Sequence, residues 1–366
     1  MGKGWRAEAR VGALYEALEH YLTGPILFDS TALTLAGCQD IARGPLGGEP
    51  AAVLLARRPS QCLACYSYHS LTGGQDVPVP VFLSAPWYVE TNADHLREEA
   101  ADTCDYGELT RYSCNSGSAI GVTTAEALLH ALNEVIERDA FSLLLARSFL
   151  GGGDSWLTVI DPGTLPRGPA LALAACERRT TSQVHLLDIT TDLGVPTMLA
   201  YIPPSSGRPH RRGVGTSLSS VHAAWRALTE LLQVSLGEDL SPPPFSPRGH
   251  LAGLVAHPAL YACGRFDLTD HLRATMTVPF APSGSASGPP EVQLREVIAT
   301  LASHGYSPYH RTVARLSGEI TAVHAIVPGL ERFMIITDGN LVIPGHRGRA
   351  AARESRNRAA GRRYVA

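Results

Sequence analysis

Residues 123–139 read TTAEALLHALNEVIERD, and this stretch decides both how the chain folds and where it carries chemistry. An α-helix turns by about 100° per residue, so Glu126, Glu134 and Glu137 fall within roughly 80° of one another. His130 lies in the same sector, and leucines and other apolar residues occupy the opposite side. The stretch therefore predicts an amphipathic helix that packs into a core and presents one acidic stripe.

The acidic stripe can be interpreted in three ways. Thr123-x-x-Glu126 matches a capping box, in which the glutamate satisfies only the helix start. A solvated acidic face is the commonest reading of such a stripe. Exposed acidic faces usually carry lysine four residues further on, whereas Lys3 is the only lysine in this chain. The third reading, carboxylates gathered for a ligand, therefore stays open for Glu134 and Glu137.

Two further stretches have helical periodicity. The helix expected over 6–22 places Glu16 and Glu19 on one face, because residues three apart are neighbours on a helix. The helix expected over 220–236 carries a mixed polar stripe at helical spacing, formed by His222, Arg226, Glu230 and Gln233. Together with the first stretch, which extends to residue 149, these form three helices that each bury one side and present one polar stripe.

Short apolar, β-branched runs between these helices are typical of strands. Strands are predicted over 51–55, 184–189, 197–202, 321–327 and 333–337. The predicted fold class is therefore mixed α/β.

The domain organisation is predicted from composition. A main domain is expected over 1–343, with an internal subdomain boundary near 240–250, where proline and glycine cluster. Beyond Pro344 the chain is rich in arginine and has no apolar period. We therefore expect residues 344–366 to form a loosely docked tail.

The overall composition excludes several classes of protein. The 366 residues are 45% hydrophobic and 18% charged, which is ordinary for a globular chain. A net charge of -3 gives no basic field for a polyanion, so nucleic acid is not expected as a partner. No apolar run reaches the length of a membrane span, and no membrane association is expected. The expected location is the cytoplasm.

The seven cysteines are an odd number scattered along the chain, which does not indicate a disulfide framework. Cys62 and Cys65 form a lone CxxC. A structural zinc site needs two more ligands, and no second pair has this spacing, so a loop or core pair is the favoured interpretation.

The polar stripes match one kind of ligand if they converge in space. Mg²⁺ takes oxygen ligands and is commonly shared between carboxylates and substrate phosphates, which two carboxylate pairs on separate helices would provide. Arg226 would suit a phosphate. The sequence has no GxxxxGK[ST] loop, so such a nucleotide site would be built between helices.

The same residues resemble the sequence motifs of the YcaO family over almost the whole chain. Gly2-Lys3-Gly4 and the helix with Glu16 and Glu19 look like the family's GKG and ExxER motifs. Residues 115–121 with the following acidic helix are similar to its SNGxAxG and ExxERD signature. Residues 213–233 look like its GxG and RALTExxQ block, and 326–331 resemble its VPGLE motif, which we expect to support the fold.

The resemblance implies a YcaO-type fold with ATP and Mg²⁺ as cofactors. By the matching motif positions, the metal would be held by Glu16, Glu19, Glu126, Glu134 and Glu137. The nucleotide would further contact Lys3, Arg138, Arg226, Glu230 and Gln233. The catalytic set implied by the resemblance is Glu16, Glu19, Glu134 and Glu137.

The resemblance also implies an activity, the phosphorylation of a backbone amide in a ribosomally synthesised precursor peptide. The resemblance is in particular to stand-alone cyclodehydratase subunits, as in microcin-type pathways, which convert Cys, Ser or Thr to azolines. The chain ends in Arg362-Arg363-Tyr364-Val365-Ala366 rather than the PxPxP of azoline-forming members. Thioamide or amidine formation therefore stays open, as does a non-catalytic, substrate-presenting subunit, which the five intact glutamates disfavour.

The expected partners follow from the same resemblance. The sequence starts almost at the GKG block, so we expect a separate leader-peptide-binding protein to deliver the precursor peptide. A flavin-dependent azoline dehydrogenase is a further partner that the resemblance implies, and a homodimer stays open.

Overall fold

The computed structural model describes residues 2–152, 157–205, 208–240, 249–273, 275–318 and 320–363, except for the side chains of residues 239 and 358–363. The chain divides into two compact units. Unit 1 comprises Met1–Leu14, Ile136–Ser287 and Glu331–Ala366. Unit 2 comprises Tyr15–Val135 and Gly288–Leu330. Helices α1 (Arg6–Thr23) and α5 (Thr124–Leu145) contribute residues to both units.

The described part of unit 2 contains a six-stranded antiparallel sheet in the order β1-β2-β10-β11-β4, with β3 paired to β2. Its strands are β1 (Thr34–Gly37), β2 (Cys62–Ser70), β3 (Val77–Pro80), β4 (Ser118–Gly121), β10 (Tyr309–Arg315) and β11 (Thr321–Ile326). The unit also has helices α2 (Cys38–Arg43), α3 (Ala52–Leu55), α4 (Asp94–Glu99) and α10 (Pro290–Ser303). One core cluster of this unit includes the fully buried aromatic residues Tyr68, Phe82 and Tyr88.

The part of α1 in unit 2 packs on this sheet. Tyr15, Leu18 and the buried Leu22 contact Ile120 of β4 and Ala322 of β11. The three α1 residues recur at intervals of three and four, the period of one helix face. Because this face is anchored on the sheet, Glu16 and Glu19 are held at fixed positions on the same helix.

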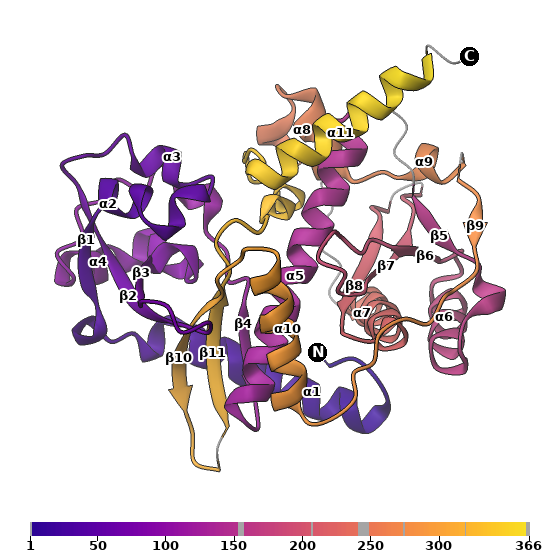
Figure 1. The fold of residues 1–366 in the computed structure, drawn as a ribbon, viewed down its shortest axis with the longest axis horizontal. Helices are drawn as coiled ribbons and strands as arrows, with labels where there is room; N and C mark the ends of the chain where they lie inside the picture. Colours follow the sequence, from indigo (N-terminus) through magenta and orange to yellow (C-terminus); the bar gives the residue numbers. More distant parts are fainter. Residues whose placement is uncertain are drawn as a thin grey trace. The chain divides into compact units, whose positions relative to one another are not determined.

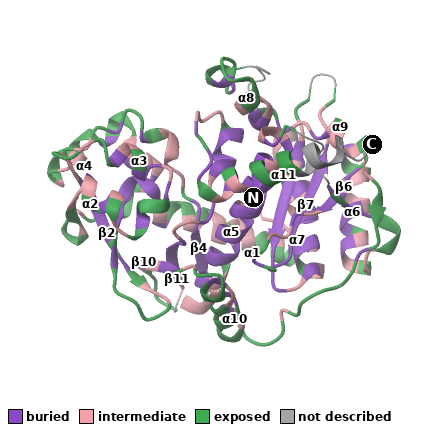
Figure 2. Cartoon of the chain, turned by 45° about the horizontal axis from the view of Figure 1, so that its top comes forward, coloured by how far each residue is buried: buried purple, intermediate pink, exposed green. Residues whose placement is uncertain are grey.

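Unit 1 contains a second sheet, whose described strands follow the order β8-β7-β6-β5-β9. The strands are β5 (Thr158–Ile160), β6 (His185–Asp188), β7 (Thr197–Ile202), β8 (Arg211–Thr216) and β9 (Thr277–Val278). The pairings are antiparallel except for β5 with β9. Figure 2 shows that β7 is buried along its whole length, as expected for a strand covered on both faces.

Two helices cover one face of the unit 1 sheet. Helices α6 (Arg167–Thr180) and α7 (Ser220–Leu240) lie side by side against it, and Leu186 and Met198 of the sheet share one core cluster with both (Figure 1). Unit 1 also contains helices α8 (Pro258–Arg265), α9 (Thr269–Arg273) and α11 (His346–Arg363) and the π-helical turn η8 (Ala146–Leu150). The layering of helices on sheets confirms the mixed α/β fold class.

Long periodic segments were predicted well. The three predicted helices are α1, α5 and α7, and the strands predicted near 185, 197 and 321 are β6, β7 and β11. Two predicted strands are wrong. Residues 52–55 form α3, and residues 333–337 lie in the 3₁₀ helix η11 (Phe333–Asp338). Both are short apolar runs, and periodicity cannot distinguish a short helical turn from a strand in such a run.

The expectation of a loosely docked C-terminal tail is also wrong. Residues 346–363 form α11, whose Arg347 makes a bidentate ion pair with the fully buried Asp139. The Arg347 Nε–Asp139 Oδ1 distance is 2.9 Å and the Nη2–Oδ2 distance is 2.8 Å. Buried Glu331 accepts a hydrogen bond from the backbone N–H of Gly348 at 2.9 Å. The sequence pattern missed this helix because its attachment rests on these polar contacts and on the small buried residues Ala351 and Ala352, which give no clear apolar period.

Other predictions concern domains and cysteines. The predicted subdomain boundary near 240–250 falls largely on residues 241–248, which lie outside the described residues. A domain end at residue 343 stays a prediction. All seven cysteines are free thiols, and Cys65 of the CxxC is buried in the core of unit 2. Among the helices that the structure describes, none has the length and apolar character needed to span a bilayer.

Candidate functional site

Helix α7 is held unusually close to strand β8 in unit 1. A Cβ atom on Gly213 would lie 2.3 Å from the backbone of Ala227 and Leu231, and one on Gly215 would lie 2.4 Å from the backbone oxygen of Ala223. Only glycine fits such an approach, which explains the Gly-x-Gly pattern. The closeness lets Glu230 Oε1 accept a hydrogen bond from the backbone N–H of Val214 at 3.2 Å.

Lys3 joins Glu230 in unit 1. Its Nζ lies 2.5 Å from Glu230 Oε2, and both side chains are less than a third exposed. The N-terminal segment is also held by Trp5, whose ring centroid lies 5.0 Å from that of Trp225 on α7. Burial would raise the pKa of Glu230, but Lys3 holds it below its ordinary value, helped by the Val214 N–H and by Arg226. Glu230 is therefore ionised at neutral pH.

Glu137 of α5 lies in the same charged cluster. It is 7% exposed, and its pKa is raised to about 7 by burial and by the negative charge of Glu230. The cations Arg226, Lys3 and Arg138 act in the opposite direction. The cluster thus brings together five residues of the predicted site: Lys3, Glu137, Arg138, Arg226 and Glu230.

A cavity of about 290 Å³ opens beside this cluster within unit 1. Its lining includes Glu137, Arg138 and Glu230 of the predicted site. Four further charged or titratable residues line it that the sequence analysis missed, namely His210, Arg211, Arg212 and Glu238. Two of them are adjacent arginines directly before Gly213, and this doublet is the signal that could have identified them.

The missed basic residues are closely packed. Arg212 Nη1 lies 2.9 Å from His210 Nε2, and its guanidinium stacks 4.7 Å from the ring centre of Phe141. Burial, helped by the positive charge of Arg212, lowers the pKa of His210 to about 3, so this histidine is neutral. Buried Arg211 has an Nε with no hydrogen-bond partner among the described residues. The cavity wall therefore offers guanidinium groups to an anion.

Unit 2 contains a separate acidic cluster. Burial first, and then the negative charges of Glu134 and Glu16, raise the pKa of Glu19 to about 8. Glu134 is further oriented by the backbone N–H of Gly117, which lies 3.4 Å from its Oε1. Glu19 of α1 and Glu134 of α5 thus lie close enough for their charges to interact, whereas the sequence left the convergence of these helices open. A carboxylate cluster that holds a proton at neutral pH is suited to exchange that proton for a cation.

Glu126 and Gln233 are placed less centrally. Thr123 Oγ1 accepts a hydrogen bond from the backbone N–H of Glu126 at 3.1 Å, and Glu126 Oε2 accepts one from the N–H of Val122 at 2.9 Å. This is close to the predicted capping box, so Glu126 serves the start of α5. Gln233 is half-buried on α7, three residues after Glu230. The predicted ligand roles of both residues stay predictions.

The acidic side chains suit Mg²⁺ by their chemistry, since this ion takes oxygen ligands. Among the described residues, no three His, Cys, Asp or Glu side chains are grouped closely enough to hold a metal ion by themselves. Mg²⁺ usually binds through one or two carboxylates, several waters and substrate phosphates, so a complete protein cage is not required. The oxygen-only donors Glu16, Glu19 and Glu134 fit this ion, and the predicted metal ligands stay predictions.

Two curated relatives share sequence with the chain. An uncharacterized protein in the tfuA 3' region of Rhizobium leguminosarum bv. trifolii is 38% identical over 132 residues, which is 33% of this chain and 30% of that protein. An uncharacterized protein of Methanothermobacter thermautotrophicus is 32% identical over 244 residues, 63% of this chain and 56% of that protein. The chain therefore spans at most about half the length of these relatives.

Several solved structures share the fold. YcaO from Methanopyrus kandleri, bound with AMPPCP and Mg²⁺, has a TM-score of 0.61 at 19% identity and covers 93% of this chain and 81% of its own. A heterocyclase in complex with substrate and cofactor has a TM-score of 0.62 at 19% identity, over 91% of this chain and 45% of its own. The E. coli microcin synthetase McbBCD complex with pro-MccB17 bound has a TM-score of 0.57 at 14% identity, and the match covers 90% of this chain and 82% of that chain. At these identities the likeness establishes the fold.

A family profile identifies the chain directly. The profile described as YcaO cyclodehydratase, ATP- and Mg²⁺-binding, matches residues 1–331 of the 366. The family's cofactors are thus ATP and Mg²⁺, as predicted. Since the match covers nearly the whole chain and agrees with the fold, the protein belongs to the YcaO family.

Proposed function

We propose that this protein uses ATP to phosphorylate a backbone amide oxygen of a ribosomally synthesised precursor peptide, and that it thereby converts Cys, Ser or Thr residues to azolines. The observation that carries the proposal is the charged cavity of unit 1, where Glu137, Arg138 and Glu230 line about 290 Å³ beside Lys3 and Arg226. Membership of a family that binds ATP and Mg²⁺ supports it.

The reaction has a definite balance of atoms. The side-chain hydroxyl or thiol of the substrate loses its proton to solvent as its oxygen or sulfur adds to the preceding carbonyl carbon, which leaves an oxyanion on the former carbonyl oxygen. The oxyanion attacks the γ-phosphorus of ATP, and ADP departs. The carbon–oxygen bond then breaks, phosphate leaves, and the former amide nitrogen loses its proton as the carbon–nitrogen double bond forms. The products are an azoline, ADP and phosphate.

The chain's own residues would act by position and charge, which is how proteins promote most phosphoryl transfers. Lys3, Arg138 and Arg226 would neutralise the phosphate oxygens, with arginine offering two parallel donors to one phosphate. Glu16, Glu19 and Glu134 would hold Mg²⁺, which screens the triphosphate when bound. Glu230 would keep Lys3 ordered through their 2.5 Å ion pair.

A binding experiment tests the nucleotide part of the proposal. Calorimetric titration of the protein with ATP and Mg²⁺ is expected to show binding that Glu134→Gln and Glu137→Gln each weaken at least about tenfold, because each removes a charge from a buried cluster. Glu296→Gln, which changes an exposed glutamate of α10, is the matched control and should bind as the unmodified protein does. Equal binding by all three variants would contradict the assigned site.

A mass measurement tests the reaction. The protein, mixed with the products of neighbouring genes and a precursor peptide, is expected to reduce the peptide mass by one water for each azoline formed. Replacement of an oxygen by sulfur would instead identify thioamide formation, while tandem fragmentation would distinguish an amidine ring from an azoline. Nucleotide binding with an unchanged peptide in the complete mixture would favour the substrate-presenting subunit. We expect the precursor to require a separate leader-peptide-binding protein, and a flavin-dependent dehydrogenase would act on the azoline afterwards.

A further inference from the structure

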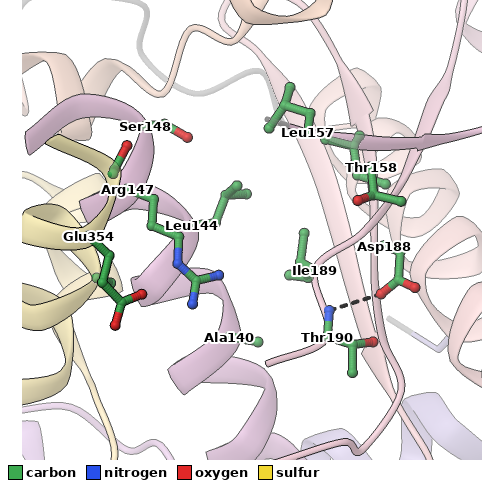
Figure 3. Close-up of a pocket in the computed structure, with 13 residues that line it drawn as sticks. Ala140, Leu144, Arg147, Ser148, Leu157, Thr158, Asp188, Ile189, Thr190 and Glu354 are labelled. Atoms are coloured by element: carbon green, nitrogen blue, oxygen red, sulfur yellow. Dashed lines mark hydrogen bonds between the residues drawn. The ribbon is translucent and has the colours of Figure 1, made fainter. Parts of the chain in front are cut away.

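A second cavity, of about 260 Å³, lies within unit 1 and shares no lining residue with the charged cavity described above. One wall is formed by α5, η8 and α11, and the other by β5 and β6 with the residues that follow β6 (Figure 3). Its volume is slightly below the range of about 300–1,000 Å³ typical of sites for drug-sized ligands, so it suits a smaller molecule.

The cavity has an apolar floor and a polar rim. Leu144, Leu157 and Ile189 on the floor are each less than a tenth exposed. Thr158 and Glu354 on the rim are exposed. A ligand that fits must therefore carry an aliphatic portion of a few carbons at one end and polar groups at the other.

Arg147 brings a positive charge into this cavity. It belongs to the five-residue π-helical turn η8, and its guanidinium points into the open space between the two walls (Figure 3). Within the described part of the chain, the side chain of Arg147 makes no hydrogen bond or ion pair. π-Helical turns are uncommon and frequently occur at functional sites, where they reposition a side chain. A guanidinium with no protein partner in a partly apolar cavity is complementary to a carboxylate.

Two carboxylates also line the cavity. Asp188 Oδ1 accepts a hydrogen bond from the backbone N–H of Thr190 at 2.9 Å, which leaves its second oxygen for another donor (Figure 3). Glu354 extends from α11 on the same side as Arg147 (Figure 3). With one arginine and two acids, the lining would repel a ligand that is only anionic and would favour one that also carries a positive charge.

We propose that this cavity binds a small zwitterion with an aliphatic side chain, that is, a free amino acid of the leucine type. The ligand carboxylate would pair with Arg147, its ammonium group would face Glu354 and Asp188, and its side chain would cover the floor formed by Leu144 and Ile189. The inference does not depend on the proposed ATP chemistry, so its failure would leave that proposal untouched.

Four probes separate the features of the ligand. L-Leucine carries all three groups, 4-methylpentanoate lacks the ammonium group, 3-methylbutylamine lacks the carboxylate, and Gly-Gly-Leu carries the carboxylate and side chain on a peptide. Each is titrated into the full-length protein and followed by calorimetry and ligand-observed NMR. L-Leucine is expected to bind at least about tenfold more tightly than each of the other three, because each one loses a charge-assisted contact.

Matched variants locate the binding. Arg147→Met removes the charge but keeps an unbranched side chain, and it should weaken L-leucine at least about tenfold. Arg353→Met, on an exposed residue of α11 outside the lining, should leave the affinity unchanged. Glu354→Gln should weaken L-leucine but not 4-methylpentanoate. Because Glu354 is exposed, Glu354→Gln should fold normally, so it still tests the inference if Arg147→Met does not fold.

Three results would each overturn the inference. They are no L-leucine binding at millimolar concentration to the folded, unmodified protein, undiminished L-leucine binding by both Arg147→Met and Glu354→Gln, or equal binding of L-leucine and Gly-Gly-Leu. The last result would identify a docking site for a peptide end instead.

Discussion

Lys3 Nζ lies 2.5 Å from Glu230 Oε2, although the two residues are 227 positions apart in the chain. The contact ties the first residues of the chain to helix α7, because the neighbouring Trp5 also packs on Trp225. Lys3 is the only lysine of the protein. Its ammonium group is therefore a unique chemical handle at the candidate site.

The first prediction uses this handle. An amine-reactive reagent should modify Lys3 more slowly than the α-amino group, since the Lys3 Nζ is partly buried in its ion pair with Glu230, and ATP with Mg²⁺ should slow the reaction of Lys3 at least about threefold further. Peptide mapping by mass spectrometry distinguishes the two amines, so the α-amino group serves as an internal control. If saturating ATP changed neither rate while calorimetry showed binding, Lys3 would not face the nucleotide.

The second prediction concerns Glu19 and pH. A carboxyl group whose pKa is raised from 4.5 to about 8 by burial, Glu134 and Glu16 holds its proton more tightly in the folded state than in the unfolded state. Its stabilising contribution is complete below about pH 4.5 and is lost as pH rises to about 8. The loss should be on the order of 3 kcal/mol, since one pKa unit corresponds to about 1.4 kcal/mol and Glu19 keeps some solvent contact.

Glu19→Gln should remove most of this pH dependence, because glutamine has no proton to lose. Urea denaturation of the variant, the unmodified protein and the control Glu296→Gln at pH 5, 7 and 9 measures the free energy of unfolding of each protein. If this free energy changed equally with pH in all three proteins, the pKa of Glu19 would not be raised in the folded state.

The third prediction tests the close approach of α7 to β8. Gly215→Ala should destabilise the protein by about 1–3 kcal/mol, because the new methyl group would meet helix backbone that cannot move aside locally. Gly253→Ala is the matched control, since nothing lies within 4 Å of a Cβ atom there. Thermal and chemical denaturation compare them. Equal stability of the two variants would show that helix and strand are packed less closely than described.

The fourth prediction concerns the ion pair between α11 and α5. Arg347→Met should destabilise the protein by about 3 kcal/mol or more, because it leaves Asp139 buried without its cation. Arg353→Met on the exposed side of α11 should change the stability by less than about 0.5 kcal/mol. The difference in free energy of unfolding between the two variants gives the result, and a difference near zero would contradict a structural role for Arg347.

The sequence predicted those parts of the molecule that depend on local pattern. Helices α1, α5 and α7 are long and periodic, so their existence and approximate bounds were predicted correctly. The capping contacts at Thr123 and Glu126 were likewise predicted from a four-residue motif. Such features need no knowledge of the rest of the fold.

Features that depend on contacts distant in sequence were missed. His210, Arg211 and Arg212 line the charged cavity only because β8 lies against α7, and the arginine doublet before Gly213 does not by itself place these residues beside a cavity. Glu137 and Glu19 have raised pKa values because other elements bury them. The segments 51–55 and 333–337 were assigned to strands because buried apolar runs carry no period of their own.

The ion pair of Arg347 with Asp139 also limits how far the protein can be shortened. A version that stops at residue 343 would delete the whole of α11 and leave a carboxylate without its cation in the middle of helix α5. The arginine-rich C-terminal segment therefore supplies, through Arg347, the positive charge that neutralises buried Asp139. Truncation there should yield aggregated material rather than a smaller working enzyme.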